Sequence, residues 1–162
     1  MIFKHKWGSF LPLFFILSCV MFSCTHGVVV HSYTHVPQQW KTHDTLTISL
    51  PDSLPAGAYF MRLETRNTVR YAYRDLWLLM YTSYENEATT ITSADTLHLY
   101  LTDERGNWQN PNTIGAHYQA EHPLQKSLIV NENSSHYRLQ FRQMMNDSIL
   151  YGLTDIGICL YK

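Results

Sequence analysis

The chain has 162 residues, with 12 basic and 13 acidic side chains, a formal net charge of −1 at pH 7 and only three cysteines. Without a basic excess there is no electrostatic case for binding nucleic acid or for a polybasic grip on lipid head groups. The length suits one domain with a hydrophobic core that needs no disulfide staples.

An apolar run, Phe10 to Phe22, is the first feature along the chain, and Lys4 and Lys6 precede it. The run is shorter than the about 20 apolar residues that a membrane-spanning helix needs, and its flanks are typical of a secretory signal. Ser23 and then Cys24 follow it, as in a loose bacterial lipobox, whose cysteine is acylated, with chains such as palmitate, and becomes the new N-terminus. Removal of residues 1–23 leaves ten basic and 13 acidic residues.

Two alternatives to lipidation at Cys24 remain. The first is lipidation at Cys19, which also follows a serine, although cleavage there would leave an apolar N-terminus on the mature protein. The second is an ordinary cleaved secretory signal, in which Cys24 has no special role. With Cys24 acylated, Cys159 is the last free cysteine, and we expect it to be a small strand residue. The predicted organisation is a signal peptide at 1–23, a lipidated N-terminus and tether at 24–43, and a folded domain at 44–162.

Beyond the anchor, apolar and polar residues alternate with a period of two, and no stretch keeps a 3.6-residue period. Residues 28–36 are a first strand or part of the tether. Further strands are expected at 44–50, 58–66, 71–84, 95–103, 114–121, 127–130, 136–145 and 154–161. Pro51 and Pro55 mark a turn, and Gly106 with Asn107 marks a tight turn.

The stretch 71–84 could also form a helix, but its dense aromatic residues favour a strand, and its apolar run suggests a central strand covered on both faces. About eight or nine short strands predict an all-β fold. We expect a single antiparallel β-sandwich of jelly-roll-like type.

Nine histidines raise the question of a metal site. His31 and His35 have a suggestive spacing, but on a strand they lie roughly 13 Å apart, too far to share one zinc ion. The other candidates are scattered over separate strands and loops: His98, His117, His122 and His136. No nucleophile elbow or paired carboxylates are present, so we expect no metal, no cofactor, no catalytic residues and no enzyme activity.

Aromatic residues are the remaining candidates for binding. Trp40 and Trp108 have polar neighbours and are expected to be exposed, whereas Trp77 lies in an apolar run and is expected in the core. Exposed aromatic rings on a β-sandwich stack on sugars or anchor a protein partner. A glycan-binding module is therefore the alternative function.

Several short motifs, taken in order, resemble the gliding motility lipoprotein family, GldH, over nearly the whole mature chain. The motifs are an early tyrosine and tryptophan, a Y-x-Y-x-x-L-x-L strand, a D-T-L strand leading to G-x-W, and a closing glycine-rich strand. Here they are Tyr33 and Trp40; Tyr71, Tyr73, Leu76 and Leu78; Asp95 to Leu97 with Gly106 and Trp108; and Gly152 to Gly157.

The resemblance implies an envelope lipoprotein that acts in gliding with other envelope components and has no known catalytic residue. We therefore expect a non-enzymatic adaptor in a gliding or secretion-type complex, held to the membrane by lipid on Cys24. Partner or glycan contacts are expected at Trp40, Trp108, Tyr71 and Tyr73. Because no acidic residue follows Cys24 closely, the periplasmic face of the outer membrane is the expected location.

Overall fold

The computed structural model describes residues 27–86, 89–109 and 117–162, and within these ranges the regular structure is entirely strand. None of the described residues forms a helix that could cross a membrane. The strands are β1 (Val28–His35), β2 (Trp40–Lys41), β3 (Leu46–Ser49), β4 (Gly57–Thr68), β5 (Asp75–Asn86), β6 (Thr89–Tyr100), β7 (His117–Pro123), β8 (Leu128–Val130), β9 (Ser134–Gln143), β10 (Ile149–Leu150) and β11 (Leu153–Tyr161).

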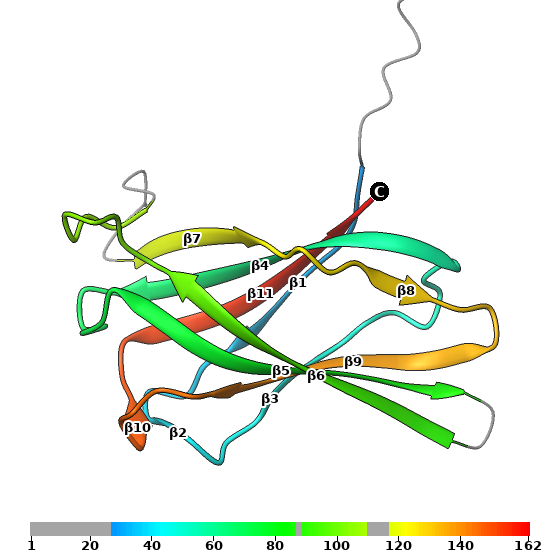
Figure 1. Cartoon of the computed structure of the whole chain (residues 1–162), viewed down its shortest axis with the longest axis horizontal. Coiled ribbons are helices and arrows are strands. Elements are labelled where there is room, and N and C mark those ends of the chain that lie inside the picture. The colour runs from blue at the N-terminus through cyan, green and yellow to red at the C-terminus, as the bar shows by residue number, and fades with distance from the viewer. Residues whose placement is uncertain (1–26, 87–88, 110–116) are drawn as a thin grey trace, which may run out of the picture.

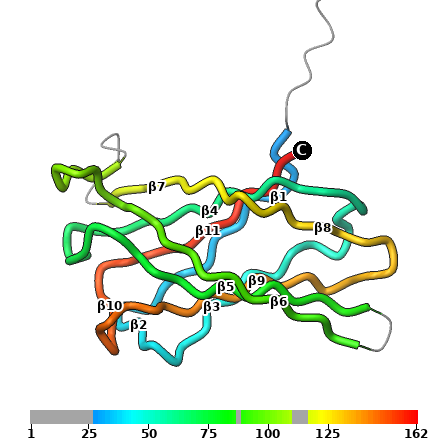
Figure 2. Tube along the Cα trace, viewed as in Figure 1, coloured from blue at the N-terminus to red at the C-terminus, as the bar shows by residue number. Residues whose placement is uncertain are grey.

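Two antiparallel sheets stack on one another (Figure 1). The first sheet has the order β1-β11-β4-β7, and β8 pairs with the beginning of β4. The second sheet has the order β3-β9-β5-β6, and the short ribbon of β2 and β10 lies at one end. Figure 2 follows the chain as it passes repeatedly from one sheet to the other.

The strand order is that of a jelly roll. If β8 and the β2–β10 ribbon are set aside, the first sheet holds the first, eighth, third and sixth main strands, and the second holds the second, seventh, fourth and fifth. Such a double-sheet arrangement buries the inner faces of both sheets and exposes the outer ones. The predicted all-β sandwich is confirmed.

Alternation along the strands builds the core between the sheets. From the first sheet, Leu63 and Ile158 point inward, and from the second sheet Leu78 and Phe141 meet them, all fully buried. Residues of the opposite parity face outward on each sheet. Polar residues dominate those outer positions on β4, where Arg62, Glu64 and Arg66 alternate with the core residues, so the sequence pattern sets the register of the sandwich.

The N-terminal boundary of the domain differs from the expected one. The sequence leaves residues 28–36 as either a first strand or part of the tether and places 37–43 in the tether, but β1 pairs with β11 along its length and Trp40 in β2 pairs with Leu150. Residues 28–35 are therefore a first strand and not part of a tether, because β1 pairs with β11 as the edge strand of the first sheet. Four residues, 24–27, separate the start of β1 from the sequence-predicted signal peptide.

Other strand boundaries also shift. Strand β5 is central, between β9 and β6, but it begins at Asp75, and Tyr71 lies in the preceding turn. Strand β6 begins at Thr89 rather than at residue 95, because polar residues there pair with the end of β5 without alternating burial. The expected strand at 114–121 appears as β7 from His117, and residues 114–116 lie outside the described residues.

Three glycines occupy backbone conformations that side chains disfavour, and two of them, Gly106 and Gly152, shape turns. Gly106 has a φ of +83° and closes the predicted tight turn, where its N–H donates to Asp103. Gly152 has a φ of +87° and lies directly against the backbone of Tyr71, with no room for a Cβ atom. The second glycine therefore fixes the contact between the turn before β5 and the start of β11.

Candidate functional site

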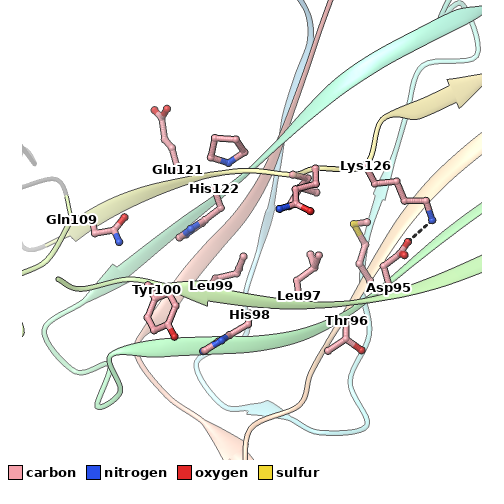
Figure 3. A pocket seen from close by; sticks show the side chains of 14 residues that line it. Asp95, Thr96, Leu97, His98, Leu99, Tyr100, Gln109, Glu121, His122 and Lys126 are labelled. Atoms are coloured by element: carbon pink, nitrogen blue, oxygen red, sulfur yellow. Dashed lines mark hydrogen bonds and ion pairs between the residues drawn. The ribbon is translucent and has the colours of Figure 1, made fainter. Parts of the chain in front are cut away.

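A groove runs between the edges of the two sheets, with β6 on one side and the segment from β7 towards β8 on the other (Figure 3). Its volume is about 640 Å³. Strand β6 is the last strand of the second sheet and β7 is the last strand of the first, so the groove lies where both sheets end. From Asp95 to Tyr100, β6 spans about 17 Å at roughly 3.3 Å per residue.

The floor of the groove is apolar. Leu97 and Leu99 point from β6 into the space (Figure 3), and Met80 of β5 and Leu124, which follows β7, also line it. Their neighbour Thr96 points the other way, as the period of two requires. The groove therefore offers alternate apolar positions at the regular spacing of an extended chain.

The walls of the groove are strand edges. Among the described strands, β6 pairs with β5 alone and β7 pairs with β4 alone. An edge strand presents backbone N–H and C=O groups that another extended segment can bond. The arrangement can accept such a segment in the manner of an added strand.

Polar side chains line the groove at three points. At one end, Lys126 Nζ lies 2.8 Å from Asp95 Oδ2, an ion pair that joins the two sheets. In the wall, burial lowers the pKa of His122 to about 4, so its ring is neutral at pH 7 and lies 3.4 Å from Thr65 Oγ1. At the third point, the Gln109 amide lines the groove, and the residue before it, Trp108, stacks on Tyr118 with ring centroids 5.1 Å apart.

A row of exposed rings lies on the outer face of the second sheet, beside the groove. Trp77 stacks on His98 with centroids 3.9 Å apart, and His98 contacts Tyr100 at 4.5 Å. Asp75 Oδ2 bonds His98 Nε2 at 2.6 Å and holds the middle ring in place. The stack covers one face of the indole, while 39% of Trp77 stays exposed.

On the outer face of the first sheet, one carboxylate organises a polar network. Glu64 has only 1% of its side chain exposed, and it accepts hydrogen bonds from Tyr33 and from Arg62 Nη2 at 2.9 Å, with His31 Nε2 at 3.0 Å. Burial alone would raise the pKa of Glu64, but these hydrogen bonds outweigh it and lower the pKa. We call this set the Glu64 network.

The Tyr33 side chain packs over the Glu64 carboxylate and donates a hydrogen bond to it. Burial and then the neighbouring Glu64 carboxylate raise the pKa of Tyr33 to about 12. Its ring lies against Gly157 of β11, and the Arg66 guanidinium stacks on it at 4.0 Å. Because every one of these polar groups has a partner, the Glu64 network reads as a rigid structural feature of the sheet.

The predicted contact residues have different fates. Trp40 is fully buried, so its expected exposure is wrong: β2 pairs with β10 and turns the indole inward, where Nε1 donates to Asp44 O at 3.2 Å. Tyr71 is buried as well, and its hydroxyl donates to Asp75 O at 2.7 Å. Tyr73 is half-buried and bonds Asp147.

Two further placements concern the tryptophans. Trp108 is half-buried and stacks on Tyr118; it does not line the groove itself but directly precedes Gln109, which does. Trp77 was expected in the core, and this expectation is wrong because Trp77 points to the outer face while its neighbours Leu76 and Leu78 fill the core. Cys24, the predicted lipidation site, lies outside the described residues.

Two further histidines each lie beside a carboxylate, and the described free cysteine is buried. His31 meets Glu64, and His35 meets Asp155 at 3.6 Å. Cys159 is a buried residue of β11, as expected, and burial raises the pKa of its thiol. Within the described ranges, no group of three or more histidine, cysteine or acidic residues is placed to hold a metal ion.

The groove and the Glu64 network were not predicted from the sequence. Both join residues far apart in the chain: Glu64 is 33 residues from His31 and 55 from Gln119, whose amide lies 3.5 Å away. The one local signal was a glutamate between core residues of β4, which by itself reads as an ordinary surface position.

No curated protein matches this chain. A solved structure with some likeness is that of dimeric latent PorU from Porphyromonas gingivalis, at 11% identity and a TM-score of 0.33; the match covers 86% of this chain and 14% of that chain. The model of the GldH lipoprotein family, in contrast, matches residues 28–160, from the first residue of β1 almost to the end of β11. The chain therefore belongs to the GldH lipoprotein family.

Proposed function

We propose that this GldH-family lipoprotein is a non-enzymatic adaptor of the cell envelope, which holds an extended segment of a partner protein in the groove between β6 and β7. The observation that carries the proposal is that two edge strands, β6 and β7, lie on either side of an apolar floor. Strand addition gains affinity from backbone hydrogen bonds and specificity from pockets for alternate side chains. Leu97 and Leu99 supply such positions on the side of β6 that faces the groove.

The charged groups that line the groove restrict which side chains the bound partner segment can carry. Lys126 and Asp95 already neutralise each other, and His122 is neutral at pH 7. A segment with apolar residues at alternate positions, and without charge on that face, fits this lining, since an unpaired charge placed against Leu97 and Leu99 would lose its hydration.

The lipid anchor is the second part of the proposal. Acylation of Cys24 would give stable attachment, because each buried CH₂ contributes about 0.8 kcal/mol and about two chains suffice. We place the protein on the periplasmic face of the outer membrane, in a gliding or secretion-type complex. Family membership and the absence of acidic residues just after Cys24 support this location.

Photo-cross-linking in intact cells tests the groove. A photoreactive residue at Gln125, an exposed residue that lines the groove, should capture one or a few envelope proteins. The same residue at Thr96, whose side chain faces away, should not. Leu97→Lys should abolish the capture at Gln125, and Thr96→Lys should leave it intact. Equal capture from both positions, or capture that survives Leu97→Lys, would rule out the groove as the binding site.

Fractionation tests the anchor separately. Cys24→Ser should move the protein from the membrane to the soluble fraction and abolish metabolic labelling with palmitate. Labelling that persists in Cys24→Ser and disappears in Cys19→Ser would move the anchor to Cys19. Membrane association unchanged in both variants would refute the lipoprotein proposal for this chain.

A glycan-binding module is a second candidate, favoured by the exposed row of Trp77, His98 and Tyr100. Aromatic rings on an open sheet face can stack on sugar rings. Trp77→Ala and Tyr100→Ala should then abolish a glycan-induced change in tryptophan fluorescence, while Trp108→Ala should not. Binding of cell-wall or host glycans that persists in Trp77→Ala and Tyr100→Ala would exclude this row as the site.

A further inference from the structure

Apolar side chains gather where β1 begins and β11 ends, on the outer face of the first sheet. Val28 is 59% exposed, Phe60 is 52% exposed and Ile129 is 54% exposed. Val29 is exposed beside Val28, and the Tyr161 ring stacks on Phe60 with centroids 5.7 Å apart. We call these five residues the apolar end.

The strand register explains why these residues form one surface. Val28 pairs with Tyr161 of β11, and Tyr161 pairs with Phe60 of β4, so the three side chains stand in one row across three strands. Ile129 of β8 pairs with Ala58, two residues before Phe60 on the same face. The irregular register between Val28 and Val30 sets Val29 outside the regular pairing.

The next row along the sheet is polar. His31 and Arg62 flank Cys159 there, and both contact the carboxylate of Glu64. The apolar surface is therefore shallow and ends sharply at the Glu64 network. Such a narrow apolar band below a polar one suits insertion of about 5–10 Å into the boundary between head groups and acyl chains.

The position of the predicted anchor identifies what this surface contacts. Cys24 precedes Val28 by four residues, which span at most about 14 Å even when fully extended. An acylated Cys24 therefore keeps the start of β1 close to the head groups. Figure 1 shows that the C-terminus lies beside the start of β1, so Tyr161 and Lys162 share this location.

We propose that the apolar end is a membrane contact: Phe60, Ile129, Val28 and Val29 enter the interfacial layer of the bilayer. The inference rests on the proposed lipid anchor at Cys24. Tyr161 and Lys162 suit the same layer, because tyrosine rings favour the level of the head groups and a lysine can reach the lipid phosphates. The contact fixes which end of the sandwich faces the membrane and leaves the β6–β7 groove open to a partner.

Depth-dependent quenching in vesicles tests the contact with the full lipidated protein. Ala58→Cys and Ala94→Cys are matched sites, both exposed alanines on strands, one beside Phe60 and one on β6. A bimane fluorophore can be attached at each, since Cys159 is buried. Lipids with a nitroxide high in the acyl chain should quench the label at Ala58 at least several-fold more than the label at Ala94.

Substitutions then test the side chains. Phe60→Ser with Ile129→Ser should reduce the ratio of membrane-seated to free orientations roughly 10- to 150-fold, since each half-exposed side chain gives up about half of its burial free energy. The matched control, Val69→Ser with Ile91→Ser, removes two exposed apolar side chains elsewhere and should leave the quenching at Ala58 unchanged. The label at Ala58 in the otherwise unaltered chain decides the question even if the double variant does not fold.

Other outcomes overturn the inference. Weak and equal quenching at Ala58 and Ala94, in protein shown by mass to carry lipid on Cys24, would refute the membrane contact and leave the anchor intact. An apolar environment at Ala58 that depends on protein density, without nitroxide quenching, would mean that a second copy covers the surface. Loss of lipid from Cys24 would instead contradict the proposed function itself.

Discussion

Replacing Gly157 by alanine probes the Glu64 network through a single methyl group. A Cβ atom built on Gly157 would lie 2.5 Å from ring atoms Cδ1 and Cε1 of Tyr33, closer than atoms can approach. Gly157 lies within β11, in extended backbone, so the substitution is not strained by its own conformation. The steric conflict is therefore with Tyr33 alone, and the ring must leave Glu64 and Arg66.

The expected cost follows from the contacts that Tyr33 makes. A hydrogen bond to a charged group contributes about 1.5–3 kcal/mol, and stacking of Arg66 on the ring adds about 0.5–1 kcal/mol. Alanine regains about 0.5–1 kcal/mol over glycine inside a strand. The free energy of unfolding should fall by about 1–3 kcal/mol.

Urea unfolding followed by tryptophan fluorescence measures this change in a double-mutant cycle. In a Tyr33→Ala background, Gly157→Ala should be neutral or slightly stabilising, because no ring remains to be displaced. Tyr33→Phe keeps the ring and isolates the hydrogen bond to Glu64. If Gly157→Ala costs as much in the Tyr33→Ala background as in the parent chain, the steric argument is wrong.

Three further predictions concern stability. Gly152→Ala should lower the free energy of unfolding by more than about 3 kcal/mol, because its Cβ would lie 2.3 Å from the Tyr71 backbone nitrogen. Gly106→Ala, at a similar φ but in open space, should lower it by only about 1–2 kcal/mol in the same urea titration. Folding holds the pKa of His122 at about 4 instead of 6.5, so between these pH values the unfolded chain binds more protons than the folded one. The free energy of unfolding should therefore fall by about 3 kcal/mol from pH 7 to pH 4, and His122→Gln should remove this pH dependence. Trp40→Ala should cost about 3–5 kcal/mol by thermal unfolding, and a loss below about 1 kcal/mol would contradict its burial.

The strands that alternate cleanly were predictable from local pattern. Leu46 and Ile48 of β3 are buried while Thr47 and Ser49 are exposed, and Gly106 closes its turn as expected. In both cases the physical cause lies within a few residues, in the two-residue period of a strand or the φ range of glycine.

The errors arise where distant partners decide the outcome. Polar neighbours made Trp40 look exposed, but its burial depends on β10, more than 100 residues later. The apolar run around Trp77 looked like core on both faces, whereas Trp77 lies on the outer face, stacks on His98 and stays 39% exposed. The order of the motifs identified the family correctly, but it gave no information on the groove.

The pairing of β1 with β11 has a mechanical consequence. With lipid on Cys24, any pull between membrane and body enters at the start of β1 and runs along the strand. Antiparallel hydrogen bonds lie across the strand direction, so this load shears the pairs from Val28 to His35 together instead of peeling them one by one. A molecule connected in this way can transmit force to the envelope through its edge strand without unravelling from it.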